Sequence, residues 1–428
     1  MADDNTEPVI EAPQSLRSYL VARRAEQFAF LSALVRIKSE NPPGETGAVA
    51  AKLEQLMAGM DFRVSRHPVD EKAAKALGRQ PYDNLSVVLE FGDDPGQGPS
   101  LVIACHADTA PAGIDWTRDP QGAAIEGGRM YGRGVSEGKS DLAAYAYALA
   151  AVRDCAEGMQ GRVELLIGFD GASGGDLGPH AMLAGMASKP DFAIVPGGAR
   201  AIGTTATGVL DLDVTVRGSP APAGVPQAGA DALEGASAVL AALYKHRNTL
   251  SARKSEVRGI GSPTLVVTEI RGGAGALAVP DRVTLLVDRR LLPEEDPKAV
   301  ESELTNIIGR AAAPVPGVVC RVRRRRLLPA VVPGDEVKPL VDQLRAAGEG
   351  VSGERPAVYG AAFETSARDF AAAGVPVVMY GAGGVGASGH MATRPDEALT
   401  LDDLRIATEV LANVVVDLLG GQAPPNDP

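Results

Sequence analysis

The chain has 428 residues, of which 45% are hydrophobic and 22% charged. Because one hydrophobic core rarely serves a chain of this length, we expect a water-soluble globular protein with two domains. The formal net charge of -12 excludes a general nucleic-acid-binding surface and gives no reason to expect attraction to a membrane.

The first part of the chain alternates between helical and strand-like segments. Residues 1–13 form an acidic, polar tail that is unlike a signal peptide, and the three cysteines are too few and too unevenly spaced for a disulfide framework, so we expect a cytoplasmic protein. The predicted helices are 14–36, 45–60, 139–154 and 178–187, and the predicted strands are 85–91, 101–104, 163–169 and 191–195. Residues 14–205 therefore predict an α/β domain with a mixed, largely parallel sheet covered by helices.

A different order of elements begins near residue 206. Predicted strands and helices follow one another as βαββαβ through residue 328, which is the order of a ferredoxin-like domain. Helices and a strand return over 329–420, and 421–428 reads as a second tail. We therefore predict that one domain is inserted into another.

Chemically active side chains gather where the strand predicted at 101–104 ends. Cys105, His106 and Asp108 follow it directly, and about thirty residues later Glu137 and Lys139 precede an alanine-rich helix. An imidazole and a carboxylate at neighbouring strand ends are the beginning of a metal site. A thiol beside an imidazole is also a known nucleophilic pair, but adjacent strand residues point to opposite faces, so a buried thiol is the better interpretation of Cys105.

The order and spacing of several motifs along nearly the whole chain are specific. They are Ser39-Glu40-Asn41-Pro42-Pro43-Gly44, His106-Ala107-Asp108, Tyr131-Gly132-Arg133-Gly134, Asp288 with Arg290, and Pro395-Asp396-Glu397. Together they resemble the di-zinc exopeptidase and deacylase family that includes aminoacylase, acetylornithine deacetylase, succinyl-diaminopimelate desuccinylase and carboxypeptidase G. The resemblance implies a zinc-exopeptidase-like domain with an inserted lid, through which relatives form homodimers.

In that family two zinc ions share a bridging aspartate, and a separate glutamate is the general base for the bridging water. The resemblance places the first zinc histidine at His106, and Asp108 as the carboxylate that orients it. Glu137 stands where the bridging aspartate is expected, and its extra methylene moves the carboxylate by more than ~1 Å.

The other chemical positions of the family fall on residues that cannot perform the expected roles. They are Gly171 and Ala172 for the base and ligand glutamates, Gly197 for another carboxylate ligand, Pro222 for the oxyanion histidine, Leu277 for an asparagine, and Thr393 for the last zinc histidine. His390 lies three residues before Thr393 and could replace it if the loop shifts. The resemblance therefore implies a degenerate metal site.

Three hypotheses for function follow. The first is a pseudoenzyme without a cofactor, which acts as a binding, regulatory or complex-forming subunit. The second is an amidohydrolase or deacylase of N-acyl amino acids or small peptides, with one zinc ion held by His106, Glu137 and His390. The third is metal-free lyase, isomerase or condensation chemistry by Cys105, His106, Glu137 or Lys139.

Partners and ligands are expected mainly from the resemblance. Glu364, Ser366 and Arg368 lie in the stretch that lines the substrate pocket of relatives, and Arg368 could either hold a carboxylate or cap a helix. We expect a homodimer centred on 209–324, with a protein partner or a small amino-acid-like ligand, and neither nucleic acid nor a membrane. The arginine-rich run at 321–326 is interpreted as a solvated strand edge that discourages edge pairing.

Overall fold

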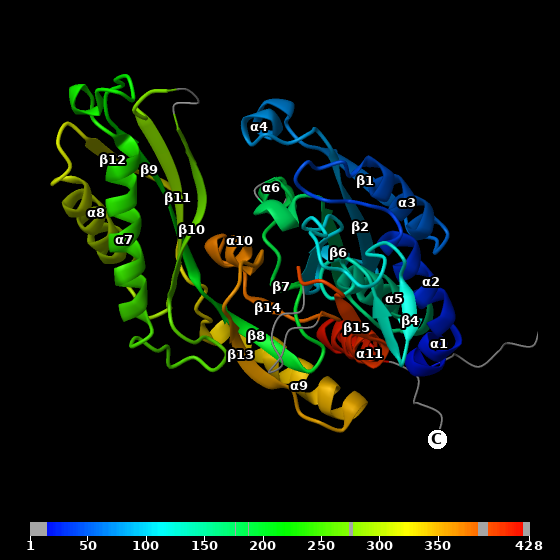
Figure 1. Cartoon of the computed structure of the whole chain (residues 1–428). Coiled ribbons are helices and arrows are strands. Elements are labelled where there is room, and N and C mark those ends of the chain that lie inside the picture. The colour runs from blue at the N-terminus through cyan, green and yellow to red at the C-terminus, as the bar shows by residue number, and fades with distance from the viewer. Residues whose placement is uncertain (1–14, 176, 187, 274–276, 384–392, 423–428) are drawn as a thin grey trace, which may run out of the picture. The chain divides into compact units, whose positions relative to one another are not determined.

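The computed structural model describes residues 15–175, 177–186, 188–273, 277–383 and 393–422, and the chain divides into two compact units (Figure 1). The first unit comprises Met1–Ile202, Gly334–Ala357 and Ala372–Pro428, and the second comprises Gly203–Pro333 and Val358–Ala371. We expected residues 329–420 to continue the α/β domain of 14–205, but residues 358–371 belong to the unit that contains the insertion. The predicted tails at 1–13 and 421–428 lie almost entirely outside the described residues.

An eight-stranded sheet, most of whose strands belong to the first unit, has the order β1-β2-β6-β3-β7-β14-β8-β13. Its strands are β1 (Val64–Pro68), β2 (Asp83–Phe91), β3 (Ser100–His106), β6 (Gly161–Gly168), β7 (Phe192–Val195), β8 (Ala201–Ala206), β13 (Ala357–Ala361) and β14 (Val377–Met379). β6, β3, β7 and β14 run parallel to one another, whereas β2 pairs antiparallel with both β1 and β6 at one end of the sheet. The predicted mixed, largely parallel sheet is confirmed.

Helices cover this sheet because their apolar residues need a buried face. α5 (Lys139–Cys155) is alanine-rich and buried on nearly all sides, and it packs against β3 and against helices α1, α2 and α11. The helices of the unit are α1 (Leu16–Ala22), α2 (Arg24–Val35), α3 (Gly47–Ala58), α4 (Glu71–Ala76), α6 (Pro179–Ala184), α9 (Lys338–Ser352) and α11 (Leu401–Leu418). A small sheet of β4 (Ala124–Glu126), β5 (Arg129–Tyr131) and β15 (Ala398–Thr400) completes it.

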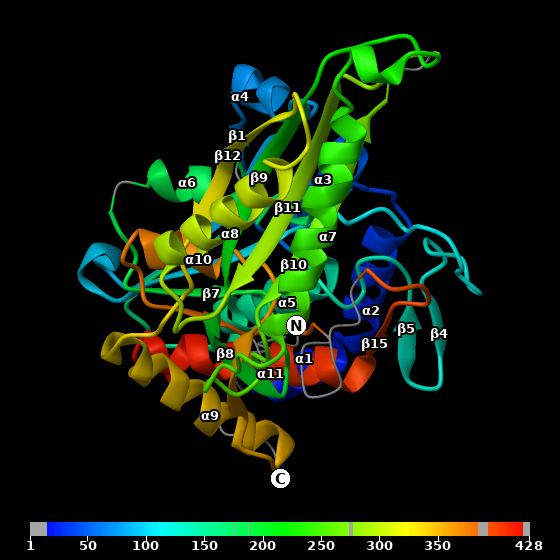
Figure 2. The same cartoon turned by 60° about the vertical axis from the view of Figure 1, so that its left-hand side comes forward.

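The second unit has a four-stranded antiparallel sheet in the order β10-β11-β9-β12, with two helices on one face (Figure 2). Its elements follow the chain as β9 (Gly208–Arg217), α7 (Ala232–Leu250), β10 (Thr264–Gly272), β11 (Arg282–Leu291), α8 (Pro297–Ala312) and β12 (Val319–Leu328), and α10 (Ala367–Ala372) begins in its last segment. Asp231 and Asp296 cap α7 and α8 by accepting hydrogen bonds from backbone N–H groups. This is the predicted βαββαβ order.

Alternation along the strands separates an apolar face from a charged one. Leu210, Leu212, Val214 and Val216 of β9 point into the core under the helices, so Asp211 and Asp213 lie on the other face. The register of β12 shifts between Arg324 and Arg326. Because of this bulge, Arg326 pairs with Asp211 and lies on the charged face.

No helix within the part of the chain that the structure describes is both long and apolar enough to cross a lipid bilayer.

Candidate functional site

His106 lies at the carboxyl end of β3 between two carboxylates. Its Nδ1 is 3.1 Å from Oδ1 of Asp108, and its Nε2 is 3.8 Å from Oε1 of Glu137. Burial lowers the pKa of His106, but the two carboxylates outweigh burial and hold that pKa well above its usual value. The structure therefore brings together the three residues that the sequence placed at this point.

Backbone atoms of two glycines enclose the His106 ring. A Cβ atom added at Gly171 would lie 2.3 Å from Cγ of His106, and one at Gly138 would lie 2.9 Å from its Cε1. Both separations are shorter than any normal contact between carbon atoms. The backbone as it stands thus leaves no room for a side chain at position 171, where the resemblance expects the catalytic glutamate.

The carboxylate of Asp108 fixes that backbone. Its Oδ1 accepts a hydrogen bond from the N–H of Gly171 at 2.9 Å, and its Oδ2 accepts one from the N–H of Ala172 at 3.0 Å. Asp108 is fully buried, so leaving it without these donors would be costly. Asp108 thereby orients both the imidazole and the short 3-10 helix at Gly171–Ser173.

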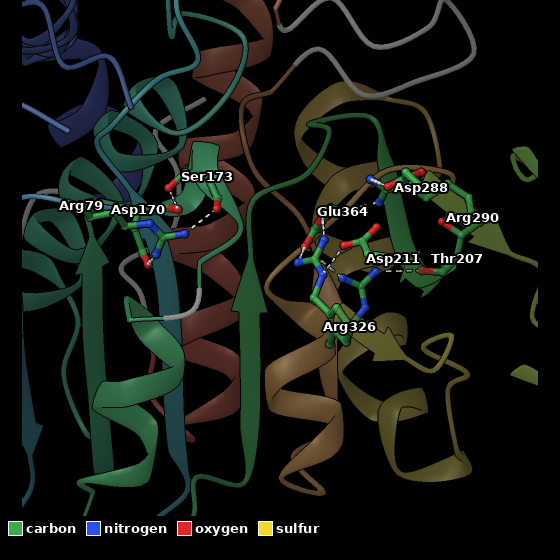
Figure 3. Close-up of polar contacts among 10 residues, drawn as sticks. Arg79, Asp170, Ser173, Thr207, Asp211, Asp288, Arg290, Arg326 and Glu364 are labelled. Atoms are coloured by element: carbon green, nitrogen blue, oxygen red, sulfur yellow. Dashed lines mark hydrogen bonds and ion pairs between the residues drawn. The ribbon is translucent and has the colours of Figure 1, made fainter. Parts of the chain in front are cut away.

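A second ion pair holds the same loop from its other side. Nη1 of Arg79 is 2.7 Å from Oδ2 of Asp170, and Nη2 donates to the carbonyl oxygen of Ser173 at 2.5 Å (Figure 3). Burial raises the pKa of the fully buried Asp170, and the backbone N–H of Leu177 and the Arg79 guanidinium oppose that rise. No sequence pattern indicated Arg79, because it lies 91 residues from Asp170.

The other two candidates for metal-free chemistry, Lys139 and Cys105, are buried and contribute to the structure of the first unit. Lys139 Nζ donates to the carbonyl oxygens of Leu34 and Ile37, both at 2.9 Å, at the end of α2. Burial lowers the pKa of Lys139 to about 8. Cys105 lies in the hydrophobic core, where burial raises the pKa of its thiol well above the usual value.

Glu397 anchors the loop that precedes α5. Its Oε1 accepts hydrogen bonds from the N–H groups of Gly134 and Ser136 and from the Ser136 hydroxyl, and its Oε2 is 2.8 Å from Nη1 of Arg133. Both charged side chains are almost fully buried. The motifs that contain them were noted for the resemblance, but their contact was not predicted.

The remaining family positions also lack suitable donors. A Cβ at Gly197 would lie 2.5 Å from the carbonyl carbon of Met379, so the end of β14 packs directly on this glycine. Pro222 and Leu277 lie close together, because Pro222 bridges to Ala278, and Leu277 is 90% exposed. Thr393 is exposed with a φ of 68°, while His390 lies outside the described residues.

Three arginines of the second unit surround Glu364. Arg326 binds it in bidentate fashion, with Nη1 2.5 Å from Oε1 and Nη2 3.1 Å from Oε2 (Figure 3). Arg290 Nη1 is 3.6 Å from Oε2, and Arg368 Nη1 is 3.7 Å from Oε1. Arg368 and Glu364 are thus in contact as an ion pair, and Ser366 accepts a bond from the N–H of Asp369 through its carbonyl oxygen.

Neighbouring groups complete this arginine cluster, which we define as Arg290, Arg326 and Arg368. Arg326 Nε lies 2.9 Å from Asp211, and Arg290 makes two contacts of 3.1 and 2.9 Å with Asp288. Arg368 Nη2 donates to the carbonyl oxygen of Thr207 at 2.8 Å. Arg368 is buried, and this burial lowers the pKa of its guanidinium group.

Comparison with known proteins gives the family. Residues 102–417 match the model of peptidase family M20/M25/M40. The chain belongs to this family. It is 27% identical over 384 residues to a succinyl-diaminopimelate desuccinylase of Gluconobacter oxydans, covering 87% of this chain and 92% of that protein.

Solved structures of two dipeptidases share the fold. The dipeptidase Dug1p of Saccharomyces cerevisiae superposes with a TM-score of 0.76 at 14% identity, covering 95% of this chain and 98% of that one. Human carnosine dipeptidase 1 gives 0.72 at 18% identity, covering 96% and 100%. The resemblance inferred from the motifs is confirmed at the level of family and fold.

The described residues do not fit the pair of zinc ions that the resemblance implies. Positions 171, 172 and 197 carry no donor side chain, and at 171 and 197 the backbone approaches its neighbours too closely for one. Within the described ranges, no three His, Cys, Asp or Glu side chains gather in a way that could hold a metal ion. His106 and Glu137 offer two donors at most toward a site that needs three or four.

Proposed function

We propose that this chain is a cytoplasmic, non-hydrolytic member of the M20 family, which binds a small amino-acid-like ligand or a protein partner without cleaving it. One observation carries the proposal: the backbone of Gly171 is packed on the His106 ring, and the resemblance places the general base at this position. The free cysteines, two of them buried, suit a reducing compartment.

The energetics support loss of tight metal binding. A structural zinc ion contributes ~10 to 16 kcal/mol through four ligands, so each missing ligand removes several kcal/mol. A glutamate at 171 would also have to displace the imidazole or break the two hydrogen bonds from the loop to Asp108. Restoring the general base by one substitution is therefore opposed by the local packing.

A second candidate function is hydrolysis at a mononuclear metal site. The observation in its favour is that His106 Nε2 and Glu137 Oε1 lie 3.8 Å apart, with Glu137 one-third exposed. A third ligand from His390 would complete such a site. By contrast, the positions of Cys105 in the core and of Lys139 on two carbonyl groups give no support to metal-free chemistry by these residues.

Metal analysis separates the two candidates. The protein is equilibrated with zinc, passed over a desalting column and analysed for metal, and it is assayed in parallel on N-acyl amino acids and dipeptides. We expect far less than one zinc per chain and no hydrolysis. Stoichiometric zinc that is lost in Glu137→Ala but kept in the control His67→Ala, a histidine of β1, would overturn the proposal.

We also propose that the second unit forms a homodimer through the β10 edge of its sheet. Val266 and Ile270 on this edge strand are 44% and 53% exposed, whereas the opposite edge, β12, presents exposed arginines that discourage pairing. Ile270→Lys should shift the mass in light scattering from dimer to monomer. Val319→Lys, at an equally exposed apolar position of β12, is the control that should leave the dimer intact.

A further inference from the structure

A cavity of about 390 Å³ lies in the first unit, where strands β1, β2 and β6 meet helix α6 (Figure 1). Alternate residues of β6 point to opposite faces of the sheet. Those at odd positions join the core beneath α5, and those at even positions line the cavity. None of the described residues that line the cavity belongs to the region around His106, so it is a separate space.

Asn84 of β2 presents an acceptor without a donor to this cavity. Its Nδ2 donates to the carbonyl oxygen of Leu177 at 2.7 Å, which fixes the orientation of the side-chain amide. Among the described residues Oδ1 has no hydrogen-bond partner, although Asn84 is only 1% exposed. A buried acceptor in this state is costly. An occupant of the cavity is therefore expected to bring an N–H or O–H group to Oδ1.

Apolar side chains form two walls of the cavity. Leu166 of β6 is buried in the wall made by the sheet, and it pairs with Ser86, two residues from Asn84 along β2. Met182 of α6 is buried in the wall made by the helix. Thioether groups adapt to the shape of a neighbour and make favourable contacts with aromatic rings. These walls favour an occupant with an aromatic body.

The charges of the lining do not favour an anion. Nη2 of Arg162 is 2.9 Å from Oε2 of Glu164, so the guanidinium group is already paired. Asp70, which caps α4, adds a second carboxylate. With His67 neutral, two carboxylates stand against one guanidinium group, and the lining has a net charge of about -1. A carboxylate or phosphate would be repelled here.

We propose that this cavity binds a small neutral aromatic molecule through an N–H group that donates to Oδ1 of Asn84. The site needs neither a metal nor hydrolysis, so the inference goes beyond the proposed function. The occupant is also linked to the loop at Gly171. Leu177 accepts a hydrogen bond from Asn84 through its carbonyl oxygen, and its N–H donates to Oδ2 of Asp170 at 2.8 Å.

Benzamide and acetophenone are matched probes for the N–H group, because an amino group in the first takes the place of a methyl group in the second. Binding to the whole chain is measured by isothermal titration calorimetry in EDTA. We expect benzamide to bind with an affinity on the order of millimolar. Acetophenone should bind about tenfold or more weakly, because it leaves Asn84 unpaired. Equal affinities of the two probes would contradict the role assigned to Asn84.

Two alanines of α6 give matched variants that locate the bound probe. Ala181 and Ala184 are both exposed, but of the two only Ala181 lines the cavity. Ala181→Phe should fill part of the space and weaken benzamide binding about tenfold or more, whereas Ala184→Phe should leave it unchanged. Unchanged binding in Ala181→Phe, or equal weakening in both variants, would place the probe elsewhere and overturn the inference. If Ala181→Phe does not fold, the comparison of benzamide with acetophenone on the wild type decides.

Benzoate tests the expected charge of the ligand. It keeps the ring of benzamide but has no N–H group and carries a negative charge, so it should bind about tenfold or more weakly than benzamide. Tighter binding of benzoate would overturn the assignment to a neutral ligand. Absence of benzamide binding by the wild type would overturn the inference as a whole. Because EDTA keeps metals out of these titrations, such a failure is separate from a failure of the zinc test.

Discussion

The surroundings of His106 in the first unit and of Glu364 in the second are held in different ways. Backbone atoms of Gly138 and Gly171 enclose the imidazole, and backbone N–H groups occupy Asp108. Around Glu364 the partners are guanidinium groups on long side chains. Contacts with backbone atoms hold the first region, whereas ion pairs between charged side chains hold the second.

This difference indicates which of the two regions can rearrange more readily. Main-chain packing is set by the sheet and its loops, so a ligand cannot open it without moving a strand end. Side-chain ion pairs that water partly reaches can exchange partners at much smaller cost. We therefore expect the surroundings of Glu364 to rearrange more readily than those of His106, and hydrolytic function to be absent from the first unit.

Removing Arg326 should have the largest effect on stability, because two carboxylates lose their hydrogen bonds to this guanidinium group. Asp211 and Glu364 both bind this side chain, which is 24% exposed. We expect Arg326→Ala to lower the free energy of unfolding by about 3 kcal/mol in urea denaturation. Arg323→Ala, on the same strand but 79% exposed and paired with Asp213, should cost less than about 1 kcal/mol.

Equal losses of unfolding free energy in Arg326→Ala and Arg323→Ala would contradict this difference between the two regions. They would mean that the arginine cluster is as well solvated as the surface pair. The charge balance around Glu364 would then contribute no more than an ordinary surface contact.

A methyl group at Gly171 tests the main-chain packing directly. Because its Cβ would lie 2.3 Å from the His106 ring, Gly171→Ala should lower the free energy of unfolding by about 2 kcal/mol. Gly350→Ala is the control: this glycine lies within α9 with nothing close to a new Cβ, so it should stabilise by about 0.5 to 1 kcal/mol. An unchanged midpoint for Gly171→Ala would show that the loop has room for a side chain after all.

Much of the fold was predictable because its signals are local. The apolar run before Cys105, the alanine-rich helix after Lys139 and the βαββαβ order depend on residues close together in the chain, and each was found with end points within a few residues. Motif order then gave the family, which the match over 102–417 confirms. The gathering of His106, Asp108 and Glu137 follows from the same local reasoning.

The contacts that define the two regions were not predictable, because they join distant residues. Arg326 lies 115 residues from Asp211 and 38 from Glu364, and it reaches them only because a bulge turns it to the charged face. The sequence placed it in a run interpreted as a solvated edge. A glycine at 171 signals a missing side chain, but its distance from an imidazole depends on the fold.

The pKa of a second histidine can be compared with that of His106, because the two histidines lie in different units. His246 of α7 lies 3.9 Å from Glu303, and its side chain is only 10% exposed. Burial lowers the pKa of His246, the carboxylate of Glu303 opposes this, and Arg253 and Arg289 lower the pKa further. His106, between its carboxylates, has the opposite shift.

The two shifts give stability contributions of opposite sign. A histidine whose folded pKa is lowered binds its proton more weakly in the folded state, so the unfolded state takes up more protons as pH falls below about 6.5, and stability falls. His106 contributes in the other direction, with stability that is lost as pH rises through its raised pKa. The wild-type curve contains both contributions, and a variant must separate them.

Substitution of His246 isolates the contribution of this histidine to the pH dependence of stability. His246→Gln should lose less stability than the wild type between pH 6.5 and pH 5, measured as urea midpoints at each pH. Glu303→Gln should lose more, because removing the carboxylate lowers the pKa of His246 further. Parallel midpoint curves for all three proteins would show that His246 is as well solvated as a free histidine. The environment of His246 would then have no measurable effect on its pKa.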